Sequence, residues 1–294
     1  MLAFRQRVER KRASSLYLVN RTKLTPEASR ALEWAERQLG REIRLDRYTL
    51  PQVMAAALRS MYLNASNHET EAGVALYIDP TRSDSTWAHC DSTVGAYMNL
   101  LGRFDVATRR LTLWHAEDET HAALEYFSPV FRKWVYYDPL YGAILLTGSG
   151  VPAGVQDIQG EISQKGFDTD KWRFQAVRIY DLFDDTPVEA VDSGYGVFEE
   201  VDYDDVLRNY LNVIAIRRED VQQSGGSLPG SEIKGRWLVI DNTALSPAPD
   251  ERAGRLIRRV VESFSTRQPF LKNQHFELSI VRGVSEADLG LGDE

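Results

Sequence analysis

The sequence predicts an α+β fold, in which helices pack against an antiparallel sheet. Apolar residues recur at helical spacing after Cys90, and three short runs rich in aromatic and β-branched residues follow within residues 109–138. A helix followed by such a meander of strands is typical of this class. Further helix and strand patterns follow residue 150. We therefore expect a core with N-terminal helices over residues 1–150 and a C-terminal α+β region over residues 151–294.

Two amphipathic helices are predicted before Cys90. The first covers residues 25–39, with Thr25 as the N-cap and Pro26 at the first helical position. The second covers residues 50–63 and is followed by residues typical of a turn. A strand is expected over residues 73–78.

Cys90 is the only cysteine of the chain. The apolar stripe of Val94, Tyr97, Met98 and Leu101 predicts a helix that begins at or near Cys90. In a first helical turn, unpaired N–H groups and the positive end of the dipole favour thiolate over thiol. A lone cysteine is more often a small buried side chain, so its assignment as a nucleophile depends on the residues downstream.

A predicted β-hairpin supplies partners for this thiol. Its strands cover residues 120–127 and 132–138, and residues 128–131, with proline second, suit a type I turn. If the strands pair outward from this loop, His121 lies opposite Asp138. Directly opposed residues have Cβ atoms ~4.5–5.5 Å apart, within reach of a hydrogen bond between imidazole and carboxylate. Cysteine, histidine and aspartate in this arrangement are the nucleophile, base and orienting group of thiol acyl transfer.

Residues 87–142 resemble the core of the transglutaminase-like superfamily, whose papain-like fold carries a Cys-His-Asp triad. His-Cys-Asp-Ser-Thr precedes an apolar helix, His-Ala-Ala-Leu-Glu-Tyr begins at residue 121, and Trp-Val-Tyr-Tyr-Asp-Pro-Leu-Tyr-Gly ends at residue 142. These motifs stand in the order of the family. The resemblance implies a helix bearing the cysteine on an antiparallel sheet, with catalytic positions at Cys90, His121 and Asp138 and framework positions at Glu125, Trp134, Pro139 and Gly142. Residues 102–110 depart from the family, which usually has a tight glycine turn there.

The resemblance implies a thiol hydrolase or acyltransferase that acts on an amide- or peptide-bearing substrate through a thioester. His121 would take the proton of the thiol, and Asp138 would orient and stabilise the imidazole. Water or an amine acceptor would then receive the acyl group, and the triad alone does not distinguish the two. The alternative function is a catalytically silent module of this fold that binds a protein partner.

The second oxyanion donor stays open at this stage. In papain-like folds the contacts come from the N–H of the nucleophile and one upstream donor, for which Trp87 and Asn64 are both candidates. His89 adjoins Cys90, but successive side chains point apart, so we expect it in the wall of the cleft or at the surface. His115 is the weaker candidate for the base, because the hairpin register supplies no carboxylate facing it.

Composition excludes several other classes. A net charge of −8 argues against broad affinity for nucleic acids, which depends on an excess of Lys and Arg. The histidines are scattered, and the sequence lacks both zinc-ligand spacing and a phosphate-binding glycine loop, so we expect neither a metal nor a cofactor. A single cysteine excludes an internal disulfide and fits a reducing compartment. Because no apolar run approaches the ~18–20 residues of a membrane span, we expect a cytoplasmic protein.

The C-terminal region shows its own alternation of helices and strands. We expect strands over residues 172–180, 235–241 and 276–282, and helices over residues 203–216 and 250–264. Neither an internal repeat nor a catalytic constellation is recognisable there. We assign this region to substrate selection or partner binding by default.

Overall fold

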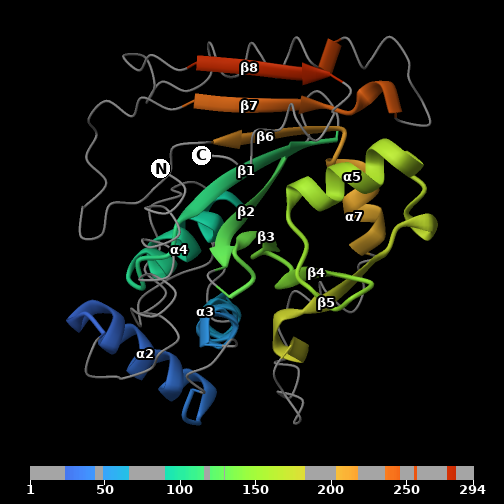
Figure 1. Ribbon diagram of the computed structural model, residues 1–294. Coiled ribbons are helices and arrows are strands. Elements are labelled where there is room, and N and C mark those ends of the chain that lie inside the picture. Colours follow the sequence, from blue (N-terminus) through green and yellow to red (C-terminus); the bar gives the residue numbers. More distant parts are fainter. Residues whose placement is uncertain are drawn as a thin grey trace, which may run out of the picture.

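The structure is a computed structural model that describes residues 24–43, 49–65, 90–115, 120–128, 130–182, 203–217, 236–245, 255–256 and 277–282. These residues form an α+β architecture, as the sequence predicts, with helices on both faces of one sheet (Figure 1). The longer helices are α2 (Pro26–Leu39), α3 (Thr49–Ala65), α4 (Cys90–Gly102), α5 (Val155–Lys165) and α7 (Tyr203–Tyr210). The strands are β1 (Thr108–Trp114), β2 (Thr120–Ser128), β3 (Lys133–Asp138), β4 (Ala143–Thr147), β5 (Phe174–Arg178), β6 (Val213–Arg217), β7 (Arg236–Asp241) and β8 (Glu277–Arg282).

Strands from both predicted regions lie in one sheet. Its order is β5-β4-β3-β2-β1-β6-β7-β8, and all neighbours are antiparallel except β7 and β8, which are parallel. The boundary expected near residue 150 falls after β4, whose residues pair with β5 along the whole strand. On the other side of the hairpin, β6 pairs with β1. The C-terminal region therefore extends the sheet at both edges.

Side chains that alternate along the strands feed two hydrophobic cores. Leu124 and Tyr137 join α2, α3 and α4 in one core, whereas their neighbours Ala123 and Tyr136 join α5 and α7 in the other. This division follows from the two-residue period of a strand, which sends successive side chains to opposite faces. In Figure 1, α3 and α4 accordingly lie on one side of the sheet and α5 and α7 on the other. The hairpin of β2 and β3 lies between both layers.

The ends of α2 and α4 follow from local chemistry. Thr25 caps α2 as predicted, since its hydroxyl accepts a hydrogen bond from the backbone N–H of Ala28 at 3.1 Å. Gly40 then ends the helix with a positive φ of 66°. Helix α4 begins at Cys90 and ends at Gly102, after which Asp105 takes a φ of 55° on the way to β1. This turn lies in the segment where the sequence departs from the family pattern.

The predicted register of the β2–β3 hairpin is wrong by two residues. Phe127 pairs with Trp134, and Ser128 pairs with Lys133, so Ser128 belongs to the strand. The chain reverses through Arg132, which has a φ of 54° and whose N–H donates to the Ser128 carbonyl at 2.7 Å. Because a shift of two preserves the face of every side chain, the residues predicted to face each other become diagonal neighbours.

The predicted helix over residues 203–216 is also wrong in its second half. Helix α7 ends at Tyr210, and Val213–Arg217 forms strand β6 between β1 and β7. Val206, Tyr210 and Ile214 have helical spacing, but residues 213–216 are buried on both faces of the sheet. A central strand buried on both faces has a continuous apolar run, which periodicity does not separate from a buried helix.

The other predicted elements fall as follows. Strands β7 and β8 match the predictions over residues 235–241 and 276–282, and β5 occupies the centre of the run over residues 172–180. The predicted strand over residues 73–78 lies outside the described residues. So does the predicted helix over residues 250–264, except for residues 255–256, which are helical.

Candidate active site

Cys90 lies at the start of α4, where the sequence places it. Its side chain is half-buried and is a free thiol. The sulfur hydrogen-bonds with the imidazole of His121 and with the backbone N–H of Ala122, which follows His121 on β2. The sulfur therefore lies at the start of a helix and has two hydrogen-bonding partners on the adjacent strand.

His121 links this thiol to Asp138. Its Nε2 atom lies 2.7 Å from Oδ2 of Asp138, and the two side chains are only 5% and 0% exposed. Since Nε2 faces the carboxylate, the Nδ1 side of the ring is left for the sulfur. The structure thus brings Cys90, His121 and Asp138 into one hydrogen-bonded chain, although the last two are diagonal and not directly opposed.

The two titratable partners of this chain shift in opposite directions. Burial raises the pKa of the Cys90 thiol, but the hydrogen bond and the charge of His121, together with the Ala122 N–H, outweigh it and lower the pKa overall. Burial alone lowers the pKa of His121, whereas the charge and hydrogen bond of Asp138, assisted by Cys90, raise it to about 10. Both shifts favour a thiolate paired with an imidazolium.

Asp138 is held by the turn that follows it. It is the last residue of β3, and its Oδ1 atom accepts a hydrogen bond from the backbone N–H of Leu140 at 3.1 Å. Gly142 ends this turn with a φ of 62°, and a Cβ atom there would lie 2.4 Å from Cδ2 of Leu58 in α3. Glycine therefore satisfies both the backbone conformation and the close approach of α3.

Two residues that the family resemblance assigns to the framework meet in a buried cluster. Glu125 is fully buried, and it accepts hydrogen bonds from Nε of Arg109 and from the backbone N–H of Val155, each at 2.7 Å. The guanidinium of Arg109 lies 4.0 Å from the ring centre of Trp134. A Cβ atom at Gly154 would come within 2.4 Å of the Trp134 carbonyl oxygen. The cluster anchors the start of α5 to β2 and β3.

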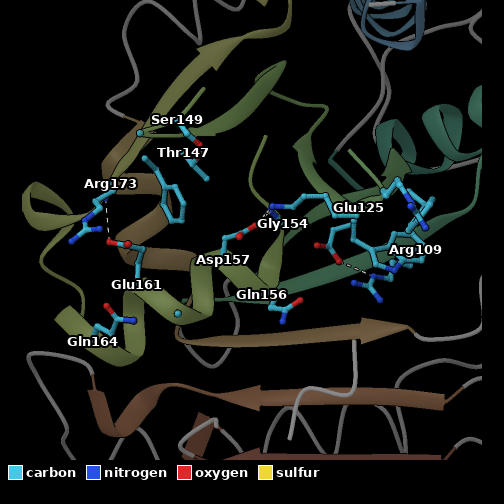
Figure 2. A pocket seen from close by; sticks show the side chains of 17 residues that line it. Arg109, Glu125, Thr147, Ser149, Gly154, Gln156, Asp157, Glu161, Gln164 and Arg173 are labelled. Carbon is cyan, nitrogen blue, oxygen red and sulfur yellow. Dashed lines mark hydrogen bonds and ion pairs between the residues drawn. The ribbon is translucent and has the colours of Figure 1, made fainter. Parts of the chain in front are cut away.

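A cavity of about 750 Å³ lies beside this cluster, on the side of α5 (Figure 2). Its charged lining alternates in sign: Arg109 pairs with Glu125, and Lys133 pairs with Asp157 at 2.5 Å. Cys90, His121 and Asp138 do not line it. The cavity lies near the Ser128 end of β2, whereas His121 is at the opposite end of that strand.

The other predicted site residues are placed only in part. The Nδ1 atom of His115, the weaker candidate for the base, lies 3.1 Å from the backbone oxygen of Asn209. The histidine beside the thiol is His121. Trp87 and His89 lie outside the described residues. Asn64 belongs to α3, but its side chain is not among those described. The choice of a second oxyanion donor therefore stays a prediction.

Sequence reasoning missed three tyrosines that lie beside His121 and Asp138. The hydroxyl of Tyr203, the first residue of α7, donates to Oδ2 of Asp138 at 2.9 Å. The rings of Tyr141 and Tyr210 lie 5.6 Å and 5.3 Å from the imidazole of His121. No sequence signal could have found Tyr203, because it is 65 positions from Asp138 and joins it only through the tertiary fold.

Two further properties hold for the part of the chain that the structure describes. It contains no group of three His, Cys, Asp or Glu side chains placed to bind a metal ion. Within the same residues, no helix is long and apolar enough to span a lipid bilayer.

Comparisons of the chain with protein-family models, with curated proteins and with solved structures give no match.

Proposed function

We propose that the protein is a thiol hydrolase or acyltransferase of transglutaminase-like type, acting on amide or peptide bonds. The observation that carries the proposal is the series of contacts from the half-buried Cys90 through His121 to Asp138, in which the imidazole and the carboxylate are buried 2.7 Å apart. The nucleophile, base and orienting group of thiol acyl transfer require this connectivity. The resemblance of residues 87–142 to the family independently names the same three residues.

In the proposed reaction, the Cys90 thiolate attacks the carbonyl carbon of an amide. The tetrahedral intermediate collapses to a thioester as the C–N bond breaks, and the imidazolium of His121 donates its proton to the departing amine. Water or a second amine then attacks the thioester and gives a proton to His121, and the thiolate leaves. The raised pKa of His121, about 10, keeps the required proton on the imidazole at neutral pH.

The surroundings of the thiol support this chemistry. The N-terminal turn of α4 and the N–H of Ala122 stabilise negative charge on the sulfur. The backbone N–H of Cys90, in that same turn, is suited to contact the oxyanion. Asp138 accepts three hydrogen bonds, from His121, Tyr203 and Leu140, so its charged form is satisfied although the side chain is fully buried.

Thiol reactivity separates an enzyme from a silent binding module. We expect iodoacetamide to alkylate Cys90 rapidly near pH 7, with a rate that falls only when the pH drops through the lowered pKa of the thiol. The matched control is His121→Ala, which keeps the cysteine and removes its partner. A parent thiol that reacts slowly, with an ordinary pKa and at the rate of the control, would refute the proposal and favour the binding module.

A further inference from the structure

Tyr203 connects the C-terminal region to the candidate active site. It is the first residue of α7 and is 5% exposed. Its hydroxyl lies 2.9 Å from Oδ2 of Asp138, the same oxygen that faces Nε2 of His121. One carboxylate oxygen therefore has two partners, the imidazole and a tyrosine.

The donor and the acceptor in each of these hydrogen bonds follow from the number of protons that each group carries. An ionised carboxylate only accepts, so the single hydroxyl proton of Tyr203 points to Asp138. The oxygen of Tyr203 lies 3.1 Å from the hydroxyl of Tyr136, which must then be the donor to Tyr203. Both side chains are buried, and burial and the charge of Asp138 raise the pKa of each well above its usual range. The hydroxyl of Tyr136 thus donates to that of Tyr203, which in turn donates to the carboxylate of Asp138.

Packing fixes the position of Tyr203. Val206 and Leu207, on the following turn of α7, are buried in the same core as Tyr136 of β3. The ring of Tyr203 also meets Tyr141 edge-on, with ring centres 5.6 Å apart. Since the ring of Tyr203 contacts Tyr141, its hydroxyl contacts Tyr136 and its helix is anchored in the core, the hydroxyl has little freedom to leave Asp138.

We propose that Tyr203 is a positioning residue of the reaction, and that α7 of the C-terminal region completes the site of the N-terminal core. This inference rests on the proposed function. The hydroxyl of Tyr203 holds Oδ2 of Asp138 against His121 and stabilises the charged carboxylate in a buried place. The carboxylate in turn stabilises the imidazolium that accompanies the Cys90 thiolate.

Tyr203→Phe tests the role, because it removes the hydroxyl and keeps the ring. Tyr97→Phe is the matched control: Tyr97 is a fully buried tyrosine of α4 whose hydroxyl donates to the Met54 carbonyl at 3.0 Å, away from Asp138. Alkylation of Cys90 by iodoacetamide is followed against pH for the full-length chain. We expect Tyr203→Phe to move the acidic limb upward by about one pH unit, equivalent to about tenfold slower alkylation on that limb. Tyr97→Phe should coincide with the parent protein.

The two proposals fail in different ways. If the parent thiol titrates as an ordinary cysteine, both the proposed function and the role of Tyr203 are overturned. If the parent thiol is activated but the Tyr203→Phe profile coincides with that of Tyr97→Phe, only the role of Tyr203 is overturned. Should Tyr203→Phe not fold, Tyr136→Phe decides, since it removes the donor to Tyr203. A smaller upward shift of the same limb then supports the inference, and an unchanged profile overturns it.

Discussion

Replacing Asp138 by asparagine removes one charge and leaves the size of the side chain nearly unchanged. Three donors converge on the carboxylate: Leu140 on Oδ1, and His121 and Tyr203 on Oδ2. An amide has one accepting oxygen and one donating nitrogen. With the oxygen toward His121, the amide nitrogen confronts the N–H of Leu140. With the amide flipped, the nitrogen donates to Nε2, and the imidazole must carry its own proton on the side of the thiol.

Both arrangements weaken the thiolate–imidazolium pair. The pKa of His121 is about 10, compared with 6.5 for an ordinary histidine, a difference that corresponds to ~5 kcal/mol at ~1.4 kcal/mol per pKa unit. Burial opposes this shift, Asp138 is the larger of the two groups that raise the pKa, and Cys90 is the smaller, so loss of the Asp138 charge removes most of the stabilisation. We therefore expect Asp138→Asn to fold and to lose turnover by about 10²–10⁴-fold, in line with the effect of a wrong tautomer in a triad.

The assay follows turnover and the pH profile of Cys90 alkylation in the same preparations, with circular dichroism as the check on folding. The acidic limb of alkylation should move to higher pH, because an amide still hydrogen-bonds the imidazole but does not stabilise its positive charge. Unchanged turnover together with an unchanged profile would show that Asp138 only ends β3 and holds the turn to Gly142. The third member of the chain would then be assigned wrongly.

Three more outcomes are expected. Cys90→Ala should keep the fold and abolish acyl transfer, as seen by circular dichroism and turnover; retained activity would exclude Cys90 as the nucleophile. Turnover of the parent should fall as the pH rises through about 10, where the imidazolium of His121 loses the proton that it donates, and a limb near 7 would contradict the ion pair. Glu125→Gln should reduce the free energy of unfolding by ~3–5 kcal/mol in urea titrations, because it leaves the buried guanidinium of Arg109 without its counter-charge; a loss below 1 kcal/mol would refute that account.

The geometry of the candidate site could be predicted as far as local pattern and strand period allow. The spacing after Cys90 predicted the start of α4, and the two-residue period kept His121 and Asp138 on one face although the register was wrong by two. The error arose at the turn, where the backbone of Arg132 adopts a left-handed conformation that is uncommon for residues other than glycine and asparagine. Residues 129–132 contain neither glycine nor asparagine, so the sequence does not mark the position of this left-handed residue.

The C-terminal contribution lay beyond such reasoning for a different physical reason. Tyr203 meets Asp138 because α7 shares a core with Tyr136 of β3 and because β6 joins β1 in the centre of the sheet. Both contacts are non-local, and the sequence of residues 203–216 has the spacing of one continuous helix. Tertiary pairing with β1 and β7 turns its second half into a strand, which local propensity does not reveal.

The central claim is that Cys90 forms a thioester, and mass spectrometry of the protein and its peptides tests it most directly. The full-length chain is incubated with a set of peptide amides, quenched in acid and digested to locate any adduct. We predict an acyl group on the Cys90 peptide with release of the amine, lost on treatment with hydroxylamine and absent from Cys90→Ala and His121→Ala. An activated thiol that takes up no acyl group from any peptide amide, or an equal adduct in His121→Ala, would contradict the account.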